Sequence, residues 1–342
     1  MTNLMNAVGF YHALPLSNPD SFLDLSVPVP EVTGHDLLVE VRAISVNPVD
    51  TKQRLVEPKI ENQPRILGFD ASGIVKKVGP NCTLFAPGDS VFYAGDVTRP
   101  GSNSHYQLVD ERIVGKKPTQ ATFAEAAAMP LTSLTAYEAL FERLAISKNK
   151  LENKGKSILI IAASGGVGSI ATQLAKHVGL TVIGTASRPE TVKWTKDHGT
   201  DIVLNHHQPL QPQLKKYGYD QVSFILCLNN TDAYWETMAS MIAPQGKICS
   251  IVENESPLEL GKLKSKSATF VWEFMFTKAM YQTPDLLSQH DILTTISQLL
   301  DQGVIQTTLS ETIHPISAAT MRQAHRKIES GQMIGKLVLE NY

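Results

Sequence analysis

The sequence predicts an α/β protein with two domains, one rich in short β-strands and one built on a doubly wound parallel sheet. The chain has 342 residues, more than a single hydrophobic core usually serves. Short β-type runs broken by Gly and Pro fill the chain up to about residue 120. From Ser157 onward apolar strands and helical segments alternate, which is typical of parallel strands joined by crossover helices.

The domain boundaries follow from where the pattern changes. Thr122 and Glu125 have the spacing of a capping box, and a stretch of helical periodicity begins there. The closing run GKLVLE has the alternation of a strand and can return to the first sheet. We therefore expect a β-rich domain of residues 1–124 and 300–342 and a parallel-sheet domain of residues 125–299.

Composition narrows the class of function. Apolar residues make up 42% of the chain and charged residues 19%, and the net charge is −2, which argues against nucleic acid or an anionic membrane as the main partner. We find neither a signal-peptide pattern nor an apolar run of membrane-spanning length. Cys82, Cys227 and Cys249 lie too far apart for a disulfide framework. These features predict a cytoplasmic protein that acts on a small molecule.

The stretch IIAASGGVGSIATQLAKHVG predicts a dinucleotide site. It is an apolar strand that turns into an amphipathic helix, and Ala163, Gly165 and Gly168 have the spacing of the three small residues in the dinucleotide-binding fingerprint. N–H groups at a helix start favour a pyrophosphate. The alternative is a tight turn without a ligand. The residues expected to contact the cofactor here are Ser164, Gly165, Gly166 and Val167.

The end of the next strand indicates which dinucleotide is bound. NAD sites place Asp or Glu there, whereas this chain has Ser187 and Arg188 and no acid before Glu190. Arg188 and Lys193 can neutralise a 2′-phosphate and Ser187 can donate to it, so the sequence predicts NADPH. The alternative is that both cations are solvated surface charges. Later strand ends predict further contacts at Leu228, Asn229 and Ile251.

Five stretches together resemble the medium-chain dehydrogenase/reductase superfamily, in its quinone oxidoreductase-like branch, also called zinc-type alcohol dehydrogenase-like. The resemblance covers nearly the whole chain and implies a GroES-like catalytic domain, a Rossmann domain and a cleft for the nicotinamide. The stretches are AISVNPVDTKQR, ILGFDASGIVKKVG, AAAMPLTSLTAYEAL, AASGGVGSIATQLAK and GKLVL, together with WEFMFTKAMY.

The resemblance also implies roles for single residues. Asn47 is the expected catalytic residue, beside the nicotinamide, where its amide can donate to a carbonyl oxygen or a cofactor hydroxyl. A homodimer is implied because relatives pair through the Rossmann domain. Further cofactor contacts are expected at Thr132, Thr135, His206 and Lys336, and an aromatic substrate wall at Phe274 and Phe276.

Zinc-dependent members carry a Cys ligand where this chain has Asn47, and a His followed by Glu where it has Phe69 and Asp70. Asn and Phe are poor zinc ligands, so no metal is expected. Without a Lewis acid, a hydride acceptor that delocalises the developing charge is favoured over an isolated alkoxide. The prediction is an NADPH-dependent reductase of quinones or α,β-unsaturated carbonyls. The alternatives are a zinc-type alcohol dehydrogenase and a non-catalytic NADPH-binding protein with a regulatory or structural role.

Overall fold

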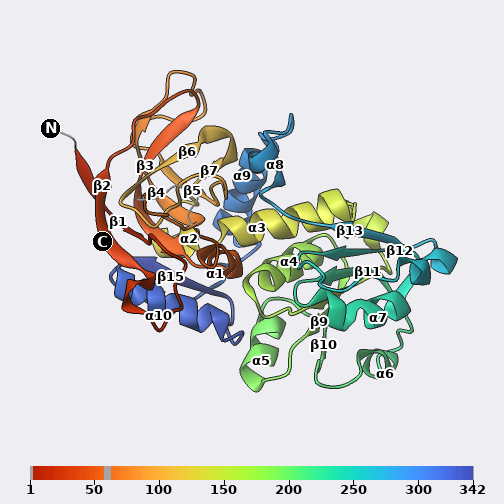
Figure 1. Cartoon of the computed structure of the whole chain (residues 1–342). Coiled ribbons are helices and arrows are strands. Elements are labelled where there is room, and N and C mark those ends of the chain that lie inside the picture. The colour runs from red at the N-terminus through yellow and green to blue at the C-terminus, as the bar shows by residue number, and fades with distance from the viewer. Residues whose placement is uncertain (1–2, 58–62, 342) are drawn as a thin grey trace. The chain divides into compact units, whose positions relative to one another are not determined.

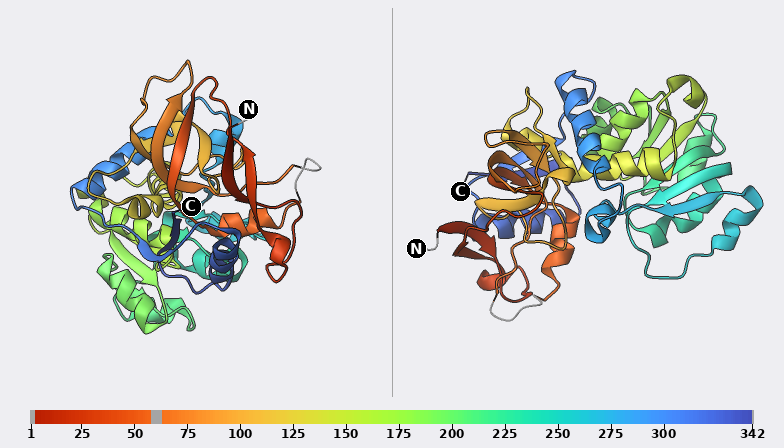
Figure 2. Two further views of the ribbon diagram at one scale, coloured as in Figure 1. Left: turned by 90° about the vertical axis from the view of Figure 1, so that its left-hand side faces the viewer. Right: turned by 90° about the horizontal axis from the view of Figure 1, so that it is seen from above.

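The computed structural model describes residues 3–57 and 63–341 and contains two compact units. The β-rich unit comprises residues 1–131 and 276–342, and the parallel-sheet unit residues 132–275 (Figure 1). Figure 2 shows both ends of the chain in the β-rich unit. In the described part of the chain, no helix is both long enough and apolar enough to span a membrane.

The β-rich unit contains nine strands that the structure describes. They are β1 (Leu4–Gly9), β2 (Leu23–Pro28), β3 (Asp36–Ser45), β4 (Asp70–Val78), β5 (Ser90–Tyr93), β6 (Tyr106–Asp110), β7 (Val114–Lys116), β14 (Leu309–Ile313) and β15 (Lys336–Glu340). Seven of them form one sheet in the order β14-β15-β3-β4-β5-β7, with β6 also paired to β3. Strands β1 and β2 form a separate antiparallel pair.

Strand β15 brings the end of the chain into this sheet. It pairs antiparallel with β3, with Val338 opposite Ser45, which confirms the expected return of GKLVLE to the first sheet. All four residues of Lys336–Leu339 are buried, as expected for a central strand. The pairing places residue 336 beside the segment that follows β3, which is where the candidate site begins.

Helices surround the sheet of the β-rich unit. They are α1 (Pro48–Arg54), α2 (Phe123–Ala127), α8 (Thr277–Tyr281), α9 (Ser288–Asp301) and α10 (Ala318–Glu329), with the 3-10 turns η1 (Pro19–Ser21) and η2 (Glu111–Ile113). The predicted capping box starts α2: Thr122 Oγ1 accepts from Glu125 N at 3.1 Å, and Thr122 N donates to the Glu125 carboxylate at 2.8 Å. Helix α3 (Pro130–Tyr137) begins in this unit and continues into the other.

The parallel-sheet unit has six strands in the order β10-β9-β8-β11-β12-β13. This is the doubly wound arrangement, whose order reverses between β8 and β11. Right-handed crossovers place α4 and α5 on one face and α6 and α7 on the other.

The strands are β8 (Ser157–Ile161), β9 (Thr181–Thr185), β10 (Ile202–Leu204), β11 (Val222–Cys227), β12 (Ile242–Ser250) and β13 (Thr269–Trp272). The helices are α4 (Gly166–His177), α5 (Pro189–Asp197), α6 (Leu210–Lys215) and α7 (Thr231–Met241), with the π-helical η3 (Glu138–Arg143) and the 3-10 turns η4 (Lys150–Asn153) and η5 (Leu260–Lys266).

The compact units divide at different residues from those expected. Residues 125–131 and 276–299 group with the β-rich unit, although we assigned them to the parallel-sheet domain. Helix α2 packs on β3 and β4, and α9 packs on β7. Helical periodicity alone does not reveal which sheet a helix covers, and this is why the compact units and the expected domains differ at these two helices.

Candidate active site

The glycine turn lies between β8 and α4. Ala162 has φ 67°, the left-handed conformation of the tight turn, and its N–H donates to Thr185 Oγ1 at 2.8 Å. A Cβ on Gly168 would lie 2.5 Å from Ala162 O, so this glycine allows the close helix–strand contact. A Cβ on Gly165 would meet only Ala162 O, at 3.6 Å. The tight turn is thus made by Ala162, not by Ala163 as the sequence spacing predicted.

The carboxyl ends of six parallel strands form one edge of the sheet, which we call the cofactor edge. The predicted cofactor residues Ser164–Val167 follow β8, Ser187 and Arg188 follow β9, His206 lies beyond β10, Leu228 and Asn229 follow β11, and Ile251 follows β12. Ligands of open α/β sheets bind at this edge, near the point where the strand order reverses. Gly165 is the N-cap of a 12-residue helix, and a Cβ on it would meet only Ala162 O, at 3.6 Å.

Ser187, Arg188 and His206 gather at one place on the cofactor edge. Ser187 Oγ and His206 Nε2 share a hydrogen bond of 3.2 Å. Burial lowers the pKa of His206, and the positive charges of His207 and Arg188 lower it further. Arg188 Nε lies 3.4 Å from Glu190 Oε1. The arrangement is a basic group suited to a phosphate.

Lys193 pairs with an acidic residue of its own helix. Its Nζ is 2.5 Å from Asp197 Oδ2 on the same face of α5, and its side chain is 77% exposed. This is an ordinary i,i+4 ion pair on an exposed helix. Thr132 and Thr135 are buried on α3 within the parallel-sheet unit.

In the β-rich unit, four buried polar side chains form what we call the Asn47 cluster: Asn47, Asp50, Asp70 and Lys336. Asn47 Nδ2 donates to Asp70 Oδ2 at 2.9 Å and, at 3.4 Å, to Ser45 O. Lys336 Nζ donates to Asp70 Oδ2 at 2.9 Å and also to Asn47 Oδ1. Both ends of the Asn47 amide are therefore occupied within the protein.

Asp70 and Asp50 fix this arrangement from two sides. The other oxygen of Asp70, Oδ1, accepts from Leu131 N at 2.7 Å. Asp50 accepts from Asn47 N at 2.8 Å, and burial raises the pKa of Asp50 to about 7, against the lowering effect of that hydrogen bond and of the Lys336 charge. Sequence reasoning missed Asp50, although the three-residue spacing from Asn47 is that of a helix N-cap pair. The ammonium of Lys336, for which we expected a cofactor contact, donates to Asp70 and Asn47.

The residues at the expected zinc position do not fit a zinc ion. Asn47 is tied to Lys336 and Asp70, and Phe69 is buried against Phe276, with ring centroids 5.0 Å apart and the planes at 62°. Zinc takes thiolate, imidazole or carboxylate ligands. Across residues 3–57 and 63–341, no group of three or more His, Cys, Asp or Glu side chains could hold a metal ion.

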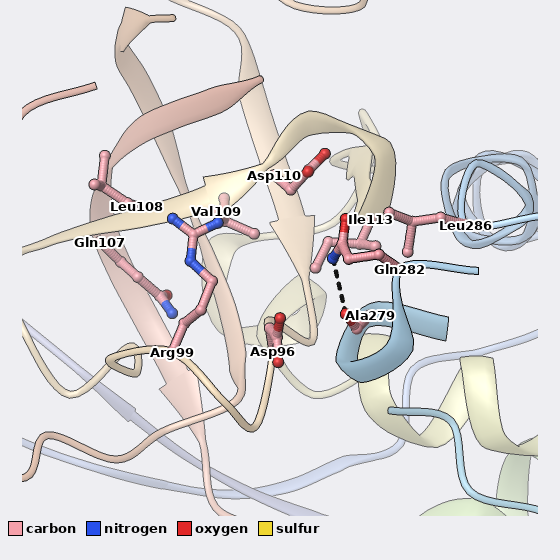
Figure 3. Close-up of a pocket in the computed structure, with 10 residues that line it drawn as sticks. All are labelled: Asp96, Arg99, Gln107, Leu108, Val109, Asp110, Ile113, Ala279, Gln282 and Leu286. Carbon is pink, nitrogen blue, oxygen red and sulfur yellow. Dashed lines mark hydrogen bonds between the residues drawn. The ribbon is translucent and has the colours of Figure 1, made fainter. Parts of the chain in front are cut away.

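The two residues of the expected aromatic wall belong to different compact units. Phe276 is buried against Phe69 in the β-rich unit, whereas Phe274 is 46% exposed and belongs to the parallel-sheet unit. Figure 3 shows a different hollow in the β-rich unit, a cavity of about 10 Å³ lined by residues such as Asp96, Arg99 and Gln107. That volume holds about one water molecule, and none of the predicted site residues lines it.

Comparison with known proteins identifies both halves of the chain. Residues 33–138 match the alcohol dehydrogenase GroES-like domain, and residues 198–339 match the zinc-binding dehydrogenase family. A zinc-type alcohol dehydrogenase-like protein of Staphylococcus epidermidis is 46% identical over 335 residues, which are 98% of this chain and 99% of that protein.

A solved structure and a plant enzyme extend the comparison. The crystal structure of a Rhizobium etli protein assigned to the zinc-dependent alcohol dehydrogenases superposes with a TM-score of 0.95 at 45% identity, covering 100% of this chain and 99% of that chain. The 2-methylene-furan-3-one reductase of Solanum lycopersicum is 36% identical over 195 residues, 54% of this chain and 48% of that enzyme.

Proposed function

Since the chain belongs to the medium-chain dehydrogenase/reductase superfamily, a superfamily of oxidoreductases, we propose that it is a zinc-independent NADPH-dependent reductase of quinones or α,β-unsaturated carbonyl compounds. One observation carries the proposal. At the family's zinc position the chain places Asn47, tied to Lys336 and Asp70, and a buried Phe69. The donor set of a zinc site is replaced by an amide, a buried ion pair and an aromatic ring.

NADPH would be held along the cofactor edge. Its pyrophosphate would lie at the glycine turn, and its 2′-phosphate beside Ser187, Arg188 and His206. When bound, the nicotinamide supplies a hydride. The protein's part is to hold substrate and cofactor in register and to stabilise the charge that develops on the substrate.

The substrate class follows from how that charge is stabilised. In a quinone or an enone, negative charge spreads onto a carbonyl oxygen, so one or two hydrogen-bond donors suffice. Asn47 is the proposed donor. Its weaker hydrogen bond, to Ser45 O at 3.4 Å, is the one that can be redirected to a substrate oxygen, while Lys336 and Asp70 keep the amide oriented. The tomato relative is named for reducing an enone, which supports this class.

We further propose a cytoplasmic homodimer that forms through the parallel-sheet unit. Strand β13 is the edge of its sheet, and Trp272 at its end is 43% exposed. Edge strands are templates for pairing with another chain. Sedimentation of the purified protein measures this directly, and a monomer at micromolar concentration would contradict it.

NADPH oxidation with matched quinones, enones and aldehydes, each with and without a zinc chelator, tests the activity. We expect turnover of quinones or enones, little with aldehydes, and no effect of the chelator. Loss of activity with the chelator and a preference for aldehydes would favour a zinc-type alcohol dehydrogenase. NADPH binding without consumption across the panel would favour a regulatory or structural protein.

Arg188→Asp tests the cofactor assignment. An acid here repels a 2′-phosphate and can accept from a ribose hydroxyl, so NADPH affinity should fall about thirtyfold, or about 2 kcal/mol, while NADH affinity holds or rises. Lys193→Asp, on the helix that Arg188 precedes, is the matched control and should change the ratio much less, because Lys193 is bound to Asp197. Unchanged NADPH affinity in Arg188→Asp would remove Arg188 from the site.

A further inference from the structure

Two buried carboxyl groups in the parallel-sheet unit interact with Arg143. Glu138 and Glu273 are 1% and 2% exposed, and we call them the glutamate pair. Arg143 Nε donates to Glu273 Oε2 at 2.8 Å. If both glutamates were ionised, the one positive charge of Arg143 could offset only one of their two negative charges. Two carboxylates in one buried site avoid this when one of them keeps a proton.

The glutamate pair lies at the cofactor edge. Glu273 directly follows β13, and its N–H donates to the carbonyl of Ser250, the last residue of β12, at 3.0 Å. Glu138 begins η3, directly after α3 and three residues after Thr135. The pair thus connects the ends of two parallel strands to the helix that carries the predicted threonine contacts. A π-helical turn such as η3 is frequently found at functional sites.

We propose that Glu138 and Glu273 share one proton, and that this neutral pair positions the ends of β12 and β13 so that NADPH binding weakens when the proton is lost. The inference rests on the proposed function, because NADPH is the ligand concerned. Glu138 and Glu273 are positioning residues here. Their effect passes through the backbone of Ser250 and Ile251, which follows the same strand end.

The surroundings of the pair support this assignment. The pKa of Glu273 is raised to about 9, mainly by burial and also by the charge and hydrogen bond of Glu138, while the charge and hydrogen bond of Arg143 lower it. Glu142, on the same turn as Arg143, lies 3.7 Å from its guanidinium and is partly exposed.

The facing thiols do not compete for this proton. Burial raises the pKa of Cys249 on β12, and the charges of Glu273 and of Cys227 on β11 add to the rise. The Cys249 thiol therefore stays protonated while the glutamate pair titrates. Loss of the shared proton then leaves two carboxylates beside one guanidinium, and their repulsion acts on the strand ends.

The test is the NADPH dissociation constant, measured by nicotinamide fluorescence from pH 7 to pH 10.5. In the wild type we expect a nearly constant value up to about pH 8.5 and a rise of about thirtyfold by pH 10.5, since each pH unit beyond the pKa of about 9 lowers the protonated fraction tenfold. Glu273→Gln cannot ionise and leaves Glu138 paired with Arg143, so its profile should stay flat. Glu142→Gln is the matched control and should follow the wild type.

Glu138→Gln provides the second variant. Because the proton is shared, it should flatten the profile as Glu273→Gln does, and both variants should be folded at pH 7 with melting temperatures at or above the wild type. Coincident profiles for the wild type and both variants would overturn the inference and leave the proposed function standing. Unfolding of both variants at pH 7 would also overturn it. No NADPH binding by the wild type at pH 7 would instead refute the proposed function, and with it this inference.

Discussion

The two groups of candidate site residues, one in each compact unit, are built in different ways. In the parallel-sheet unit the cofactor edge is made of backbone ends and short turns that follow successive strands, so its position is set by the topology of the sheet. In the β-rich unit the Asn47 cluster is a buried network whose members come from the N-cap and first turn of α1, from β4 and from β15. The first kind of site depends on close backbone packing and the second on charge compensation. Substitutions at the cofactor edge should therefore act through steric overlap with the backbone. Substitutions in the Asn47 cluster should act through an unbalanced buried charge.

The largest effect is expected when the charge balance of the Asn47 cluster is broken. Lys336→Met leaves Asp70 buried without its cation, and removing one partner of a buried ion pair costs about 3–5 kcal/mol. Urea denaturation followed by circular dichroism measures the loss in the free energy of unfolding. Adding Asp70→Asn should recover part of it, because the remaining amide oxygen can still accept from Leu131 N.

The matched control is an exposed ion pair in the same unit. Lys327 binds Glu311, and both side chains are 37% exposed, so Lys327→Met should cost less than about 1 kcal/mol. Equal losses for Lys336→Met and Lys327→Met would mean that the Asn47 cluster contributes no more than a surface pair.

The cofactor edge should instead be sensitive to single methyl groups. In Gly168→Ala the new Cβ would meet Ala162 O at 2.5 Å and the Ala163 backbone at 2.7 Å, so the fold should lose about 3 kcal/mol. Gly165→Ala has space for its Cβ and should leave stability within about 0.5 kcal/mol. Its methyl would nevertheless obstruct the pyrophosphate, so we expect NADPH affinity to fall at least about tenfold.

Urea denaturation and NADPH titration of both variants separate these effects. A Gly165→Ala protein that binds NADPH normally would show that the pyrophosphate does not approach this backbone.

The difference between the two regions also explains what could be predicted from the sequence. The alternating strands and helices predict the parallel sheet and its carboxyl edge, and Ser164–Val167, Ser187, Arg188 and His206 all lie there. The Asn47 cluster was predicted only in part, because Asp50 and Lys336 are 286 positions apart and only the pairing of β15 with β3 brings their segments together. The protonation of Asp50 depends on its burial in the folded core, and burial cannot be predicted from the residues next to Asp50 in the sequence.

A histidine in the β-rich unit allows a test by pH alone. His325 is fully buried on α10 against Phe22, and burial, aided by the charge of Arg54, lowers its pKa to about 3. In the unfolded chain His325 is therefore protonated near pH 6.5, whereas in the folded chain it is protonated only near pH 3. The stability from the neutral imidazole is full above pH 6.5 and is lost as the pH falls toward 3, by about 2 kcal/mol at pH 5.

Urea denaturation at pH 7.5 and pH 5 measures that loss. His325→Leu should reduce it by about 2 kcal/mol, whereas His12→Gln, at a side chain that is 76% exposed, should not. An equal loss in His325→Leu and the wild type would place the acid sensitivity elsewhere in the protein.

The smallest effect distinguishes two neighbouring alanines of the glycine turn. Ala162 has φ 67°, a conformation that costs an L-residue about 1–2 kcal/mol, so Ala162→Gly should stabilise the protein by up to about 1 kcal/mol after the added entropy of the unfolded chain. Ala163 is buried, and its Cβ lies where it would contact a Cβ on Gly184, so Ala163→Gly should destabilise by about 1 kcal/mol. Thermal denaturation of the two variants should therefore shift in opposite directions. Shifts of the same sign would contradict the assignment of the tight turn to Ala162. They would favour Ala163, the position that the spacing of the fingerprint predicted.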